Sequence, residues 1–136
     1  MDAAHDEAYG EPAIRVVMMP KDTNAHGTIF GGIILSQIDL AGSVEVRRHT
    51  RHPVVTIALE KVVFHEPVFV GDVVSFYTRV ARMGRTSVTV QVKVIAERAS
   101  ATERGKRVGV TEAEVVYVAV DAENRPVPLR DDAAAG

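Results

Sequence analysis

Residues 23–42, TNAHGTIFGGIILSQIDLAG, combine residue types that could do chemistry. Two adjacent glycines, Gly31 and Gly32, come directly before an apolar run with helical spacing, and Asp39 lies inside that run. A helix N-terminus presents unpaired N–H groups and the positive end of the helix dipole. Because glycine has no side chain, a substrate oxygen could approach these donors. That arrangement is an oxyanion hole.

Both features also have a purely structural interpretation. A glycine pair before a helix is a common tight entry into the helix, and a single aspartate in a helix usually lies on the solvated side. Asp39 lies two turns from Gly32, roughly 10 Å along the axis, and faces the same way. Its neighbours on that side are mostly small and polar, as a crevice would require. The spacing alone therefore leaves the chemical and the structural interpretation open.

The length of 136 residues predicts a single domain. We expect residues 12–129 to form it, with a flexible N-terminal tail at residues 1–11 and a flexible C-terminal tail at residues 130–136. The chain has no cysteine, which excludes disulfides, a thiolate nucleophile and cysteine-based metal sites.

Charge and hydropathy narrow the choice of partners and location. The formal net charge is -2 and both signs are mixed along the chain, which argues against a nucleic-acid or membrane-surface binder. The acidic N-terminus has no apolar core typical of a signal peptide. No apolar run approaches the ~20 residues that span a bilayer. We therefore expect a cytoplasmic protein.

The pattern of apolar residues predicts one helix and several strands. The only convincing helix covers about residues 32–48, with Ile34, Ile38 and Ala41 on one side and a second apolar side that includes Leu40. Valine-rich runs with period two predict a short opening strand and about four antiparallel strands after the helix. In the run 86–97 the alternation predicts one solvated face. In the run 54–68, Val55, Ile57 and Leu59 should share a face. The expected fold class is α+β.

The segments MMPKDTNAHGTIFGGIILSQIDLAG, VVFHEPVFVGDVVSFYTRVARMGRTSVTVQVKV and TEAEVVYVAVDAENRPVPL carry a family resemblance. They resemble the hot-dog-fold acyl-CoA thioesterases, and most of all the YciA-like group of short bacterial acyl-CoA hydrolases. The resemblance runs in register over about residues 14–129. It implies a curved antiparallel sheet wrapped around one long central helix, dimers as the minimal unit, hexamers as the common assembly, and active sites at the dimer interface.

The resemblance also implies roles for individual residues. The asparagine of the family motif falls on Asn24, its glycine pair on Gly31 and Gly32, and its helix aspartate on Asp39. The aspartate would act as general base, or less readily as nucleophile, beside the asparagine and glycine loop of the other subunit. The N–H of Gly32, with or without that of Gly31, would hold the oxyanion. Asn24 would orient the water or the thioester, because an amide donates and accepts at once.

The coenzyme A half of the substrate needs cations for its phosphates. In similar thioesterases the turn that corresponds to ARMGRTSV contacts the nucleotide end. This resemblance assigns that role to Arg85, Thr86 and Ser87, and Arg82 is a further cation of the same hairpin. The alternative is a solvated hairpin tip. No histidine spacing typical of a metal site is present, so we expect no metal and no cofactor apart from the coenzyme A of the substrate.

The leading hypothesis is an acyl-CoA hydrolase, and other functions on the same fold stay open. A non-catalytic acyl-CoA-binding or regulatory module would share the fold. A hot-dog hydratase pairs an aspartate with a histidine at the helix entry, whereas here Leu40 follows Asp39 and no histidine comes before His49. A purely structural oligomer module leaves Asp39 without a reason. No Gly-x-Ser-x-Gly elbow supports a serine hydrolase.

Overall fold

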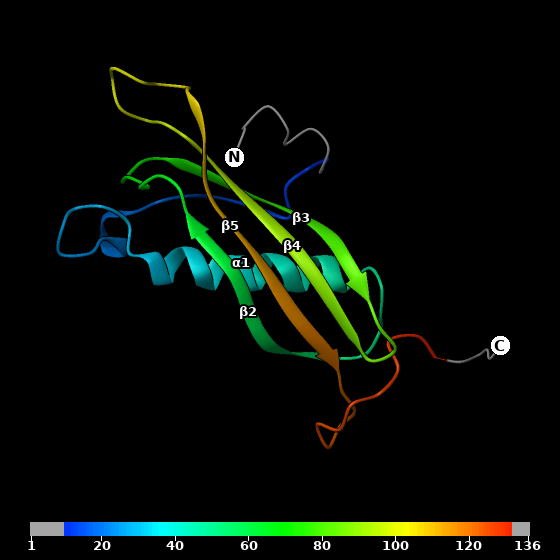
Figure 1. Ribbon diagram of the computed structural model, residues 1–136. Helices are drawn as coiled ribbons and strands as arrows, with labels where there is room; N and C mark the ends of the chain where they lie inside the picture. Colours follow the sequence, from blue (N-terminus) through cyan, green and yellow to red (C-terminus); the bar gives the residue numbers. More distant parts are fainter. Residues whose placement is uncertain (1–9, 132–136) are drawn as a thin grey trace.

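The computed structural model describes residues 10–131 and contains one α-helix and five strands (Figure 1). The helix α1 covers Gly31–Val46, and a single 3₁₀ turn, η2, covers Pro20–Asp22. The strands are β1 at Ile14–Val17, β2 at Val54–Phe64, β3 at Val73–Met83, β4 at Ser87–Glu97 and β5 at Arg107–Ala119. The helix begins one residue earlier and ends two residues earlier than the sequence pattern predicts.

The strands form one antiparallel sheet in the order β1-β3-β4-β5-β2. Helix α1 lies along one face of this sheet (Figure 1). The structure therefore confirms the α+β class, the single helix and the four antiparallel strands that follow it. It also confirms the hairpin, formed by β3 and β4, and β5 is paired with β4 on one side and β2 on the other.

One apolar stripe holds the helix on the sheet. Ile34, Ile38 and Ala41 are almost fully buried, as their helical spacing predicts, and they contact the valines on the inner face of β3, β4 and β5. The predicted second apolar side is wrong at Leu40, which is 54% exposed. The single chain therefore leaves a large apolar side chain uncovered directly beside Asp39.

Strand β4 departs from the predicted pattern of one wet face. Thr89 and Lys93, on the outer face, are buried together with the valines of the inner face. The reason is the central position of β4: Lys93 lies in register between Tyr77 of β3 and Glu112 of β5, and long side chains on both sides cover it.

Strand β2 is one of the two edge strands of the sheet, and its pairing with β5 has two irregularities. The first lies between Thr56 and Ala58, and the second lies between Glu60 and Val63, where Lys61 has a φ of 53°. Each bulge shifts the alternation of side chains by one position. Val55, Ile57 and Leu59 therefore do not share one face as predicted.

After these shifts, five side chains of β2 share the face that carries α1: Val54, Thr56, Leu59, Val62 and Phe64. This register follows from their partners on β5, which alternate between the inner and the outer face of the sheet. The bulges thus decide which β2 residues can reach the helix.

Residues 1–9 and 132–136, which include most of both predicted tails, lie outside the described residues. The domain limits at residues 12 and 129 stay predictions. Within residues 10–131, no helix is both long enough and apolar enough to cross a bilayer. The cytoplasmic location also stays a prediction.

Candidate active site

The N-terminus of α1 carries two free backbone donors. The N-cap residue is Phe30, whose own N–H is bonded to the carbonyl of Asp22 at 2.8 Å, and the N–H of Ile33 is bonded to the Phe30 carbonyl at 2.9 Å. Among residues 10–131, no acceptor is bonded to the N–H of Gly31 or of Gly32. These two groups can therefore donate hydrogen bonds to an anionic oxygen of a ligand.

Two aromatic rings flank the glycine pair. A Cβ at Gly32 would lie 2.6 Å from Cε2 of Phe30, and a Cβ at Gly31 would lie 3.4 Å from Cζ of Phe64. A side chain at Gly32 would therefore displace the Phe30 ring, which is itself exposed. Glycine at both positions lets the two rings lie against the backbone that carries the free donors.

Asn24 organises the loop that leads into the helix. Its Oδ1 accepts hydrogen bonds from the backbone N–H groups of His26 at 2.8 Å and Thr28 at 3.2 Å. Its Nδ2 donates to the Thr28 hydroxyl at 2.9 Å. A side-chain amide has two N–H donors, so one of them has no partner among the described residues. The side chain thus shapes the loop and keeps one donor available.

Asp39 lies on α1 beneath β2 and is half-buried. Its Oδ1 accepts a 2.7 Å hydrogen bond from the hydroxyl of Thr56. Its main-chain carbonyl accepts a 2.7 Å hydrogen bond from the hydroxyl of Tyr117 on β5. Burial, and then the nearby charge of Asp39, raise the pKa of the Tyr117 hydroxyl, so it remains a donor at every ordinary pH. Two elements of the sheet therefore fix the carboxylate and the turn of helix that carries it.

Gly42 makes this arrangement possible. A Cβ at Gly42 would lie only 2.1 Å from the Tyr117 hydroxyl oxygen. The absence of a side chain at Gly42 therefore lets β5 approach the helix closely. Glycine lowers the stability of the helix by up to about 1 kcal/mol relative to alanine. It does so at the position where Tyr117 reaches the backbone.

One chain does not bring the carboxylate and the free donors together. Gly32 and Asp39 are seven residues apart on one continuous helix, which separates their backbones by about 10 Å. Asn24 belongs to the loop at the same end as the glycines. The donors and the loop thus form one half of a site, and Asp39 with Thr56 forms another half two turns away.

The β3–β4 hairpin brings three of its four predicted residues into one turn. The carbonyls of Arg85 and Thr86 accept hydrogen bonds from the N–H groups of Leu129 and Ala119, and Ser87 begins β4. Arg85 lines a cavity of about 640 Å³ together with Arg130 and Asp131. Arg82 points elsewhere, because its guanidinium lies 3.8 Å from the Glu114 carboxylate on the outer face of β5.

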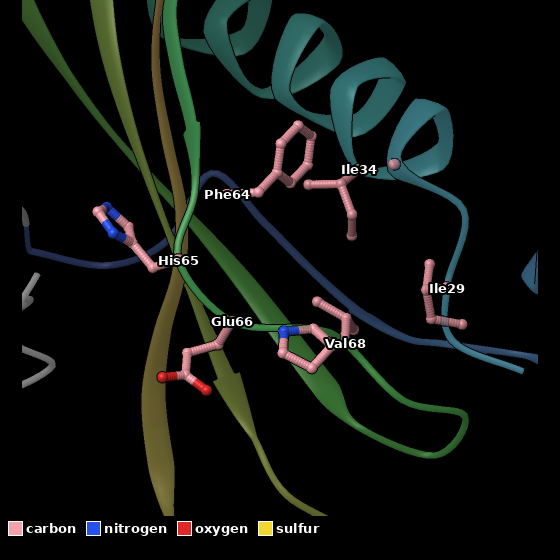
Figure 2. Close-up of a pocket in the computed structure, with 8 residues that line it drawn as sticks. Ile29, Ile34, Phe64, His65, Glu66 and Val68 are labelled. Carbon is pink, nitrogen blue, oxygen red and sulfur yellow. The ribbon is translucent and has the colours of Figure 1, made fainter. Parts of the chain in front are cut away.

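A second cavity, of about 300 Å³, lies beside the first turn of α1 (Figure 2). Four of its lining side chains are apolar: Ile29, Ile34, Phe64 and Val68. The side chains of Phe64 and Ile34 point toward one another between strand and helix, whereas His65 and Glu66 point away. Gly31 is part of the same lining, so one of the free donors lies at an apolar cavity.

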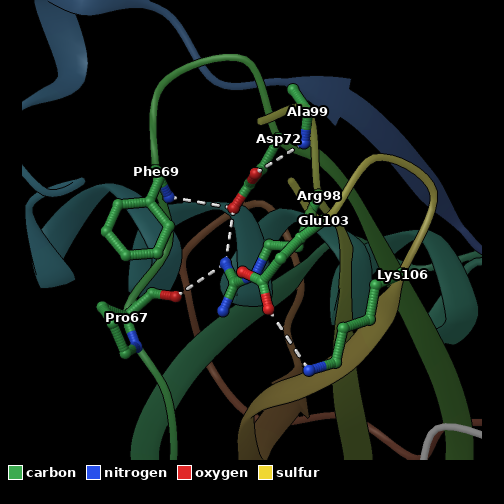
Figure 3. Close-up of polar contacts among 7 residues, drawn as sticks. All are labelled: Pro67, Phe69, Asp72, Arg98, Ala99, Glu103 and Lys106. Atoms are coloured by element: carbon green, nitrogen blue, oxygen red, sulfur yellow. Dashed lines mark hydrogen bonds and ion pairs between the residues drawn. The ribbon is translucent and has the colours of Figure 1, made fainter. Parts of the chain in front are cut away.

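The loop between β2 and β3 forms one wall of this cavity and is held by a buried ion pair (Figure 3). Arg98 donates to the Asp72 carboxylate at 2.6 Å and to the Pro67 carbonyl at 2.9 Å. Asp72 also accepts from the backbone N–H groups of Phe69 and Ala99. The guanidinium lies 4.9 Å from the centre of the Phe69 ring. The pair thus fixes the loop at both ends.

The comparisons with known proteins agree with this architecture. The family model described as the thioesterase superfamily matches residues 26–99. The chain belongs to the thioesterase superfamily. A relative from Salmonella typhimurium, named acyl-CoA thioester hydrolase YciA, is 41% identical over 129 residues, which cover 95% of this chain and 97% of that protein.

Solved structures of thioesterases have the same fold as this chain. A hexameric hotdog fold thioesterase of Campylobacter jejuni is 45% identical with a TM-score of 0.86, and the match covers 93% of this chain and 96% of that one. A hexameric broad-specificity acyl-coenzyme A thioesterase is 37% identical with a TM-score of 0.84, and the match covers 90% and 83%. The predicted hot-dog fold is therefore confirmed.

Three residues of this protein lie at the candidate active site although the sequence pattern did not indicate them. Thr56 and Phe64 share the inner face with Leu59 only because of the two bulges in β2, and bulges leave no clear mark in a valine-rich run. Tyr117 is the third, and it did leave a signal. A glycine inside a helix predicts a close neighbour, and a tyrosine on the inner face of a central strand is the natural candidate.

Proposed function

We propose that this protein is an acyl-CoA thioesterase, which hydrolyses the thioester of a fatty acyl-CoA to the free acid and coenzyme A. The observation that carries the proposal is the pair of free N–H donors at Gly31 and Gly32, on the same helix as a carboxylate positioned by Thr56. Relatives and solved neighbours of the superfamily carry acyl-CoA thioester hydrolysis in their names.

The proposed reaction uses water as the nucleophile. Asp39 removes a proton from a water molecule as its oxygen attacks the thioester carbonyl carbon. The carbonyl oxygen becomes an anion and is stabilised by the N–H of Gly32, assisted by that of Gly31, each such donor being typically worth ~3 kcal/mol. The C–S bond then breaks, coenzyme A leaves as the thiolate and takes up a proton, and the acid remains. Asn24 orients the water or the thioester with its remaining N–H.

Two copies of the chain are needed for this chemistry, because Asp39 and the glycines of one helix are about 10 Å apart. Strand β2 is an unpaired sheet edge with exposed apolar side chains, including Ile57 at 58% and Val63 at 44% exposure. Pairing two such edges antiparallel brings two α1 helices side by side in opposite directions. Asp39 of one copy then lies near the glycines of the other, and Leu40 is covered. The hexameric neighbours support a trimer of such dimers.

The coenzyme A phosphates are assigned to the β3–β4 hairpin, with Arg85 as the principal cation and Thr86 and Ser87 as hydroxyl donors. The cavity that Arg85 shares with Arg130 supports this assignment. Arg82 is a weaker candidate for binding the phosphates, since Glu114 already lies beside its guanidinium. The proposed mechanism requires no metal ion and no cofactor.

The test is hydrolysis of acyl-CoA followed by detection of the free thiol. Asp39→Asn should abolish turnover and leave coenzyme A binding largely intact, whereas undiminished hydrolysis would overturn the assignment of the base. A non-catalytic acyl-CoA-binding module is the alternative, and it would bind the same ligands without releasing thiol from the wild-type protein.

A mixing experiment tests the shared site. Gly32→Pro removes the N–H donor in the first helical turn, where proline is tolerated, and its ring displaces the exposed Phe30 side chain. Asp39→Asn and Gly32→Pro proteins should each be inactive alone. Co-refolded mixtures should regain activity, because the mixed dimer holds one site made of an intact Asp39 and the partner's intact glycine. A site within one chain would regain nothing.

A further inference from the structure

We propose that the cavity beside the first turn of α1 receives the acyl group of the substrate, and that the Phe64 ring limits the chain length that fits. The inference rests on the proposed thioesterase function and names the substrate class of that site as acyl-CoA with a short acyl chain. The cavity measures about 300 Å³, which is the lower limit of the ~300–1,000 Å³ usual for ligand pockets.

The walls of the cavity match an aliphatic chain. Ile29, Ile34 and Val68 are almost fully buried and present only hydrocarbon. The nearest charged side chain, Glu66, points away from the cavity, as does the ring of His65 (Figure 2). No side chain that lines the apolar part can pair with a charge or a hydroxyl of a ligand, so polar groups are disfavoured there.

The cavity lies where the acyl group would be. Gly31 lines it and carries one of the two free N–H donors. In the proposed complex, the N–H groups of Gly31 and Gly32 hold the oxygen of the thioester carbonyl. The acyl chain and the sulfur, which are both bonded to the carbonyl carbon, then point to opposite sides of the helix N-terminus. One substituent meets the apolar cavity, and the sulfur of the thioester is left on the side open to the second copy.

Phe64 lines the cavity on the side of β2. Its ring edge lies 3.4 Å from the Cβ position of Gly31, so it contacts the first turn of the helix directly. Phe64 is opposite Thr111 of β5 in the sheet register, and Thr111 is fully buried. An acyl chain that passes Ile34 therefore meets the ring. Because Phe64 is still 51% exposed, truncation of its side chain leaves the hydrophobic core intact.

The experiment compares kcat/KM over a series of saturated acyl-CoAs of graded length for the wild type and Phe64→Ala. The wild type should favour short chains. In Phe64→Ala the ratio of long-chain to short-chain kcat/KM should rise about tenfold, the gain expected from burying two further methylene groups. Phe64→Leu should move the ratio in the same direction by less.

Val63→Ala is the matched control. Val63 precedes Phe64 on the same strand, is similarly exposed, and faces the outer side of the sheet opposite Glu112. Its chain-length profile should equal that of the wild type. An equal shift in Val63→Ala would assign the effect to the strand edge and overturn the role of Phe64.

The two proposals can fail separately. If the wild type and Phe64→Ala release thiol with the same chain-length profile, or if the wild type favours long chains, the cavity inference is wrong and the thioesterase function stands. If no acyl-CoA is hydrolysed, the function fails. Calorimetric binding of non-hydrolysable acyl-CoA thioethers then still tests the cavity, since Phe64→Ala should bind the longer thioethers about tenfold more tightly than the wild type does.

Discussion

The hydroxyl of Thr56 on β2 donates a 2.7 Å hydrogen bond to Oδ1 of Asp39 on α1. The contact joins the edge strand to the middle of the helix and directs the carboxylate toward the sheet edge at which a second copy is proposed to pair. Thr56 does not contact the reacting atoms in the proposed mechanism. We therefore regard it as a residue that positions the base.

Replacing Thr56 with valine should slow turnover without weakening substrate binding. A hydrogen bond to a charged group contributes about 1.5–3 kcal/mol, so loss of positioning should lower kcat roughly tenfold or more while KM stays unchanged. Thr56→Ser keeps the hydroxyl and should restore most of kcat. Steady-state kinetics on one acyl-CoA checks both variants. A rise in KM with constant kcat would instead show that Thr56 contacts the substrate.

Loss of the buried ion pair between Asp72 and Arg98 should destabilise the fold. Their side chains are 2% and 6% exposed, and removing one partner of a buried pair costs about 3–5 kcal/mol because the other charge stays unpaired. Asp72→Asn should therefore lower the free energy of unfolding by an amount in that range in urea. Glu103→Gln is the control, because its pair with Lys106 is exposed and should contribute under about 1 kcal/mol. Equal effects in the two variants would contradict the prediction.

The helix and the sheet could be predicted from the sequence because each follows a simple period. Ile34, Ile38 and Ala41 recur with helical spacing and are buried as expected. The pattern failed at Leu40, which is exposed beside the proposed subunit contact, because an apolar residue at a contact between copies and one at the core look alike in the sequence.

The site could be predicted only in part. Gly31, Gly32 and Asp39 stand out because a glycine pair and a charge are unusual in an apolar run. Thr56 and Phe64 could not be placed, since a regular alternation puts them on the face opposite Leu59, and two bulges bring all three onto one face. The separation of roughly 10 Å between Gly32 and Asp39 could be predicted from helical spacing, and α1 is continuous between the two residues.

Tyr117 should make the protein sensitive to alkali. Its pKa is raised in the folded protein, chiefly by burial, above the value of about 10 that holds in the unfolded chain. The unfolded state therefore loses this proton first as the pH rises. The stabilisation is fully present below pH ~10 and is lost at about 1.4 kcal/mol per pH unit above it.

Tyr117→Phe isolates this contribution. The variant should be less stable near neutral pH by about 1 kcal/mol, because the hydrogen bond to the Asp39 carbonyl is lost. Above pH ~10 its stability should fall less steeply than that of the wild type. Urea unfolding at a series of alkaline pH values measures the two slopes. Parallel slopes would show that Tyr117 ionises equally in the folded and unfolded states.

Thr111 is the one buried side chain among the described residues whose polar atom has no hydrogen-bond partner. It is fully buried on β5, opposite Phe64 and Val94. An unsatisfied buried hydroxyl costs about 1–3 kcal/mol. Thr111→Val keeps the shape and removes the polar atom, so the free energy of unfolding should rise by about 1 kcal/mol.

Thr78→Val, on the same face of the sheet, should change the free energy of unfolding in the opposite direction. Thr78 is also buried, but its hydroxyl donates to the Glu45 carboxylate at 2.9 Å. Its replacement should lower the free energy of unfolding by about 1.5 kcal/mol or more, because Oε1 of Glu45 loses this donor while His49 stays beside Oε2. Denaturant midpoints that move in opposite directions for the two variants support the assignment. A destabilised Thr111→Val would contradict the prediction.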